Sequence, residues 1–172
     1  MKYTYTLIVV RNIEKAKQFY HDVFGLEIVV DFGTNVTLTG GIAIQTADTW
    51  KGFIHKQDEE IVFGNNACEL HFEEDDMDGF VTKLNTMKSI EYVHPLFEHS
   101  WGQRVVRFYD VDKHIIEVGE NMIMVVMRFI NTGLSIEETG TRMDVPVDYV
   151  RSLLAKKINI LGYLENFNLS AH

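Results

Sequence analysis

The segment GQRVVRFYDVDKHIIEV, residues 102–118, predicts two strands joined by a tight turn. β-Branched and aromatic residues fill both halves, as is usual in strands. The turn lies at Asp110–Lys113, because aspartate side chains accept hydrogen bonds from nearby backbone N–H groups. Glu117 lies in the second strand among apolar neighbours, which indicates a sheet covered on both faces. A carboxylate there needs a cation, a metal or a hydrogen-bond donor as its partner.

The chain before this hairpin predicts one pattern of strands and helices twice. In the first half, Asn12 is a helix N-cap and Gly25 a helix stop. In the second half, Asp76 is the corresponding N-cap. The expected strands are 3–10, 26–32, 36–39 and 42–46, and then 67–73, 90–96, 104–109 and 114–119. We therefore predict an α+β fold of two βαβββ modules, at 1–46 and 67–120, joined by a linker at 47–66.

The hairpin and the repeat together resemble the vicinal oxygen chelate superfamily. This group includes glyoxalase I, extradiol dioxygenases, fosfomycin-resistance enzymes and bleomycin-binding proteins. Its second module closes with a hairpin of the form F-x-D-P-D-G-x-x-x-E, which Phe108, Asp110, Asp112 and Glu117 match. Position 111 is valine in place of the usual proline, and position 113 is lysine in place of glycine. The resemblance covers about residues 1–120 and implies modules paired around a cavity, in a homodimer.

The resemblance also implies four metal-ligand positions, which fall here on Tyr5, Gln45, Glu69 and Glu117. Metalloenzymes of the group use histidine and glutamate, because imidazole suits Zn, Ni and Fe. His71 is the imidazole that could complete a set with Glu69, Glu117 and Gln45, since positions 69 and 71 share one strand face. This departure from the usual ligands leads us to expect no metal cofactor. The alternative is a divalent ion (Zn, Ni, Mn or Fe) in a lyase or dioxygenase with Glu69 and Glu117 as catalytic residues.

Without a metal, the cavity is a pocket for a small molecule. Tyr5, Trp50, Phe53 and Trp101 are candidate aromatic walls, and Gln45 and His71 are candidate polar contacts. Arg104 and Arg107 lie three residues apart, so a regular strand sends them to opposite faces. We expect one of them to meet an internal glutamate, where it satisfies the carboxylate or binds an acidic ligand.

Three further polar residues, His94, Glu98 and His99, are interpreted as an exposed loop. Cys68 is expected to be a small buried hydrophobe. It is the single cysteine, so no intrachain disulfide can form, which suits a reducing cytoplasm. The net charge of −9 argues against general nucleic-acid binding. No apolar run is long enough to cross a membrane.

Residues 121–172 lie outside the resemblance and predict a helical extension. We expect a helix at 122–131, a second starting at the capping box of Ser135 and Glu138, and a third from Pro146. Phe167 and Leu169 are expected to dock a final segment. The stretch 133–154 also resembles a helix-turn-helix, but residues 122–172 contain as many acidic as basic side chains, and phosphate contacts dominate DNA affinity.

These observations rank three functions. We expect a glyoxalase- or bleomycin-resistance-like protein that binds a small oxygenated or aromatic molecule, and no nucleic-acid partner. The metal-dependent lyase or dioxygenase is the alternative. A ligand-sensing regulator that acts through the helix-turn-helix-like tail is the third.

Overall fold

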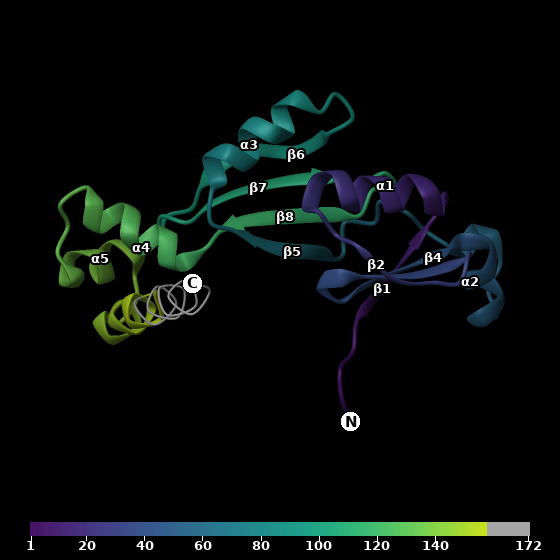
Figure 1. Ribbon diagram of the computed structural model, residues 1–172, viewed down its shortest axis with the longest axis horizontal. Coiled ribbons are helices and arrows are strands. Elements are labelled where there is room, and N and C mark those ends of the chain that lie inside the picture. Colours follow the sequence, from purple (N-terminus) through teal and green to yellow (C-terminus); the bar gives the residue numbers. More distant parts are fainter. Residues whose placement is uncertain (158–172) are drawn as a thin grey trace, which may run out of the picture. The chain divides into compact units, whose positions relative to one another are not determined.

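The computed structural model describes residues 1–157. Its elements form two four-stranded sheets and a set of C-terminal helices (Figure 1). The chain divides into two compact units, residues 1–70, 87–93 and 108–116 in the first and the remainder in the second. Each unit is described separately below.

The first sheet contains the first module and has the strand order β1-β4-β3-β2. Its elements are β1 (Thr6–Val10), α1 (Ile13–Phe24), β2 (Ile28–Asp31), β3 (Asn35–Leu38) and β4 (Ile42–Thr46). Asn12 caps α1, since its side chain accepts from the N–H of Lys15 at 3.0 Å. Gly25 ends the helix with a positive φ of 66°, which glycine adopts without a steric penalty. Strands β1 and β4 are parallel, so that Val9 lies beside Gln45.

The linker forms two short helices, α2 (Ala47–Phe53) and a 3₁₀ turn at Asp58–Glu60. The second sheet follows, with β5 (Glu69–Glu74), α3 (Met77–Thr86), β6 (Glu91–Glu98), β7 (Arg104–Tyr109) and β8 (Ile115–Glu120). Its strand order is β5-β8-β7-β6. The predicted α+β fold of two βαβββ modules is therefore confirmed.

The turn between β7 and β8 is held by buried hydrogen bonds. Asp110 accepts from the N–H groups of Asp112 and His114, from the hydroxyl of Tyr20 at 2.9 Å, and pairs with His114 Nδ1 at 2.8 Å. Burial, followed by the charge of Asp110, raises the pKa of Tyr20 well above its usual value, so the phenol remains a donor. The aspartates of the sequence motif thus serve the turn and its packing on α1.

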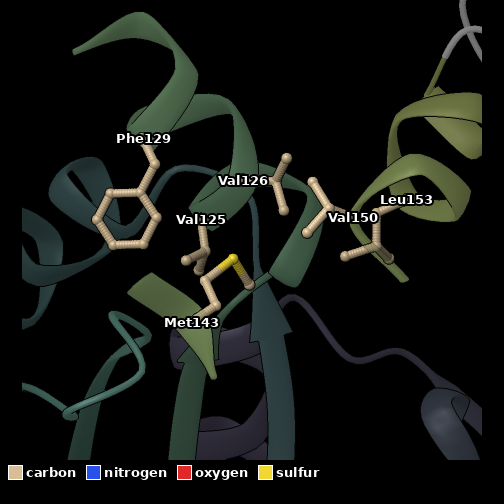
Figure 2. Packing of buried hydrophobic residues seen from close by; sticks show 6 residues of the cluster. All are labelled: Val125, Val126, Phe129, Met143, Val150 and Leu153. Carbon is tan, nitrogen blue, oxygen red and sulfur yellow. The ribbon is translucent and has the colours of Figure 1, made fainter. Parts of the chain in front are cut away.

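The extension forms α4 (Met122–Asn131), α5 (Ile136–Met143) and a further helix at 147–157. The predicted capping box is present, because Ser135 Oγ accepts from the N–H of Glu138 and the Glu138 carboxylate accepts from the N–H of Ser135. Figure 2 shows the apolar side chains that pack between these helices, which are Val125, Val126, Phe129, Met143, Val150 and Leu153. The extension therefore has an apolar core of its own.

Some expectations need correction or remain open. The first strand begins at Thr6 instead of residue 3, and Tyr3 and Tyr5 before it are exposed. All four residues of the edge strand β2 are exposed, three of them apolar, but the homodimer stays a prediction. Phe167 and Leu169 lie outside the described residues. Among residues 1–157 no helix has the length and hydropathy to span a bilayer.

Candidate functional site

The candidate site is centred on Glu117 in β8, whose carboxylate is only 7% exposed. Its Oε1 lies 2.8 Å from His71 Nδ1, and its Oε2 forms an ion pair with Arg107 Nη2 on the adjacent strand. The prediction that one of the two β7 arginines meets an internal glutamate is confirmed for Arg107. A carboxylate that would be costly to bury alone thus pairs with a guanidinium and lies against an imidazole.

Arg107 extends this cluster to His94. Its Nη1 lies 3.2 Å from His94 Nε2, and His94 Nδ1 lies 2.8 Å from the carbonyl oxygen of Pro95. A guanidinium can only donate, so Nε2 accepts and the proton of a neutral His94 is on Nδ1. The arrangement fixes the position of Arg107 between a carboxylate and an imidazole.

A hollow of about 380 Å³ lies beside Arg107 in the second unit. Its lining is mostly apolar and aromatic, from His94, Pro95, Leu96, Phe97, His99 and Arg107. The His99 ring stacks on Trp101 with their centroids 4.1 Å apart and nearly parallel. Burial, and then the charges of Arg107 and His94, lower the pKa of His99, so its ring is mainly neutral near neutrality. The hollow thus has one permanent cation in a wall of flat rings.

Gly119 makes room for the imidazole of this cluster. A methyl group at Gly119 would come within 3.1 Å of His71 Cε1 and 3.0 Å of Gln103 Nε2. The glycine therefore lets His71 and Gln103 approach the strand backbone on the same side. Gln103 in turn accepts from Trp101 Nε1 at 3.3 Å, which connects the stacked tryptophan to this face.

The residues predicted to hold a metal have other contacts or are exposed. Glu117 Oε1 lies beside His71 Nδ1 and its Oε2 forms the ion pair with Arg107, and the amide of Gln45 is engaged with Asn35 at 2.7 Å and with Thr49. Glu69 is exposed at the first position of β5, two residues before His71. Within residues 1–157 no group of three or more histidine, cysteine or acidic side chains is arranged to bind an ion. We derive no chemical step through a metal.

The other predicted site residues are spread over several places. Tyr5 is 46% exposed ahead of β1, and Phe53 is 69% exposed at the end of α2. Arg104 points away from Glu117 and binds Glu120 and Asp78. Trp101 is in the stack at the hollow. The roles of Tyr5, Gln45, Phe53 and Glu69 stay predictions.

A second hollow of about 340 Å³ lies in the first unit. Trp50 lines it, as do Leu7 and Val9 of β1 and the linker residues 60–66. His114 also lines it, with Nδ1 held by Asp110, so Nε2 is the nitrogen left for a ligand. Cys68 lines it too and is exposed, so the expectation of a buried cysteine was wrong.

Sequence reasoning missed His94 and His99, which it assigned to an exposed loop. Both are half-buried, and both line the hollow at Arg107. For His99 the available signal was its spacing of two residues from Phe97 and from Trp101, since alternating residues of an extended segment share a face. Their pairing with Arg107 depends on strand register, which local sequence does not reveal.

Two βαβββ modules, each with a four-stranded sheet, define the fold class of this chain. A family model described as a glyoxalase-like domain matches residues 3–123. The chain therefore belongs to the glyoxalase-like domain family, within the vicinal oxygen chelate superfamily. The helical extension after residue 123 lies outside the matched region.

Solved structures agree with this assignment. A protein of unknown function from Agrobacterium tumefaciens str. C58 is 37% identical, with 70% of this chain and 94% of that chain covered and a TM-score of 0.64. A glyoxalase/bleomycin resistance protein/dioxygenase family enzyme from Burkholderia phytofirmans PsJN is 16% identical (70% and 98% covered, TM-score 0.61). A lactoylglutathione lyase from Agrobacterium tumefaciens is 23% identical (70% and 93% covered, TM-score 0.55). The last two show the fold alone. No curated protein matches the sequence.

Proposed function

We propose that the protein binds a small acidic molecule, aromatic or otherwise oxygenated, in the hollow at Arg107, and that it does so without a metal. The observation that carries this proposal is the placement of Arg107. Arg107 lines a mostly apolar hollow, and the contacts of its guanidinium with Glu117 and His94 hold the side chain in one orientation. A planar guanidinium donates two parallel hydrogen bonds to a carboxylate, which gives both affinity and orientation.

The residues around Arg107 support the same class of ligand. Phe97 and the rings of His94 and His99 offer flat surfaces to an aromatic ring. Glu117 pairs with the guanidinium, and His71 contacts Glu117 in turn. The cation is therefore ordered before a ligand binds, which reduces the entropy cost of binding. Few polar groups in a mainly apolar wall are typical of sites for small molecules.

Matched ligands and matched variants test the proposal. Benzoate and benzamide have the same shape and differ in charge, so benzoate should bind and benzamide should bind much more weakly. Arg107→Gln should weaken benzoate binding by about tenfold to a hundredfold, because hydrogen bonds to charged groups contribute roughly 1.5–3 kcal/mol. Arg151→Gln is the control, since the partners of Arg151 within residues 1–157 are the exposed Glu137 and Asp148 on the extension. Isothermal titration calorimetry measures all four combinations.

The proposal fails if benzoate and benzamide bind equally, or if Arg107→Gln binds benzoate as well as Arg151→Gln does. Chemical-shift changes in an NMR titration identify the residues in contact with the ligand. Changes confined to residues other than those of the hollow would also overturn the proposal.

A divalent-metal lyase or dioxygenase is the second candidate, and the pairing of His71 with Glu117 favours it. Imidazole and carboxylate on one face are two donors that a transition metal accepts. Purified protein reloaded with Zn, Ni, Mn and Fe should retain close to one equivalent of an ion if this candidate is right, and Glu117→Gln should abolish the uptake. Retention below about a tenth of an equivalent would eliminate it.

A further inference from the structure

The helical extension contacts the loop that completes the hollow at Arg107. This loop, residues 98–103, joins β6 to β7 and contains His99 and Trp101. Two of its carbonyl oxygens accept from the extension: that of Gly102 from Arg128 Nη2 and that of Ser100 from Arg142 Nη1. The same two arginines reach Glu98 at the start of the loop, at 3.2 and 2.9 Å.

Phe129 of α4 adds a contact that only glycine allows. A Cβ atom at Gly102 would lie 2.2 Å from Phe129 Cζ, so the ring packs directly on the loop backbone. The guanidinium carbons of Arg128 and Arg142 lie 5.0 and 5.1 Å from the centre of the same ring. Gly102 has a φ of 91°, which a residue with a side chain rarely adopts. The loop is thus shaped to receive α4.

Backbone hydrogen bonds within the loop connect the residues that contact α4 to His99, which lines the hollow. Gly102 N–H donates to the carbonyl oxygen of His99 at 2.8 Å, and His99 N–H donates to that of Gln103 at 2.9 Å. These bonds close the loop into a turn. We therefore expect a displacement at Ser100 or Gly102 to shift the stacked rings of His99 and Trp101, of which His99 lines the hollow.

The geometry points to a specific role for the extension: Arg128, Arg142 and Phe129 are positioning residues that hold the His99–Trp101 wall of the ligand hollow. In its effect on binding, this inference rests on the proposed function. The position of the wall itself can be measured without any ligand. The extension follows the family-matched region, so this protein would use an added segment to shape a site that lies in the family domain.

Arg142→Gln is the most informative variant. It removes the contacts with Ser100 and Glu98, and it leaves Glu120, which is buried with Arg128, untouched. Arg128→Gln is avoided, because it would also remove one of the two guanidiniums that pair with buried Glu120. Arg151→Gln is the matched control, since it removes an ion pair on the same extension that does not contact the loop.

Trp101 reports the position of the wall in a Trp50→Phe background, where it is the remaining tryptophan. Trp101 is 39% exposed, so release of the loop should raise its acrylamide quenching constant by about twofold. Arg142→Gln should show this rise, and Arg151→Gln should match the parent. Thermal unfolding of each variant identifies any loss of fold.

Benzoate titration gives the second readout. Arg142→Gln should weaken benzoate binding by roughly threefold to thirtyfold although Arg142 does not line the hollow, as expected for coupling through a packed loop. Unchanged quenching in Arg142→Gln would overturn the inference, whatever benzoate does. If benzoate does not bind the parent protein, the proposed function fails, while the quenching result still decides whether the extension positions the loop.

Discussion

Two arginine–glutamate ion pairs join strands β7 and β8, and the glutamates differ in the additional side chain that each one contacts. Arg107 pairs with Glu117, and Arg104, three residues earlier, pairs with Glu120, three residues later. Glu117 has His71 as its other partner, whereas Glu120 has Arg128 of the extension. Both carboxylates are buried, at 7% and 2% exposure.

This difference separates a structural pair from one suited to binding. Glu120 lies between two guanidiniums, with Arg104 at 2.9 and 3.1 Å and Arg128 at 2.9 Å. Glu117 has one guanidinium partner, and its other partner, His71, is an exposed imidazole. Arg107 also lines a hollow. The pairing of buried Glu120 with two guanidiniums is therefore a structural contact that stabilises the fold. The pairing of Glu117 with Arg107, which also contacts His94 and lines a hollow, is a candidate binding site.

The largest expected effect is on stability, from Glu120→Gln. This change leaves Arg104 and Arg128 without their shared anion, and breaking a buried pair costs about 3–5 kcal/mol. Glu117→Gln should cost less, about 1–2 kcal/mol, because it breaks one pair with a guanidinium, whereas Glu120→Gln breaks two. Urea unfolding of the two variants measures the difference. Equal losses would mean that the additional side chain does not distinguish the pairs.

A smaller effect concerns how the free energy of unfolding changes at acid pH. Burial by itself would raise the pKa of Glu120, but the hydrogen bonds from Arg104 and Arg128 outweigh it, and the pKa lies below its usual value of 4.5. Protonation therefore favours the unfolded chain. The stabilisation is complete above the unfolded pKa of 4.5 and is lost as the pH falls through the lower folded pKa.

Glu120→Gln has no such ionisation to lose. Its stability deficit relative to the parent should be largest above pH 4.5 and should shrink below it. Urea midpoints measured across this range test the sign. A stability deficit that stays constant with pH would show that the ionisation of Glu120 does not contribute to the stability of the fold.

The smallest expected effect comes from His99 in the wall of the hollow. Because burial and the nearby charges of Arg107 and His94 lower its folded pKa below 6.5, the folded chain favours neutral His99. This contribution is complete above pH 6.5 and is lost as the pH falls through the folded pKa. His99→Gln should flatten this part of the stability profile, with Trp101 emission as the local probe. A profile identical to that of the parent would contradict a half-buried, neutral His99.

Much of the fold could be predicted from local sequence. Asn12, Gly25 and Ser135 marked helix ends because caps act within a few residues, and the β7–β8 hairpin followed from its strand formers and its aspartate turn. The repeat then implied two βαβββ modules. The start of the first strand was misjudged, because strand propensity at residues 3–5 does not reveal whether a neighbouring strand extends that far.

The sequence by itself determined the modules, the extension and the two arginines on opposite faces of β7, since these depend on periodicity and local hydrogen bonding. Only the tertiary structure decided which glutamate each arginine meets, that His94 and His99 share a hollow with Arg107, and that α4 packs on Gly102. These contacts join residues far apart in the chain. They depend on strand register and on side-chain packing between elements, which no short stretch of sequence encodes.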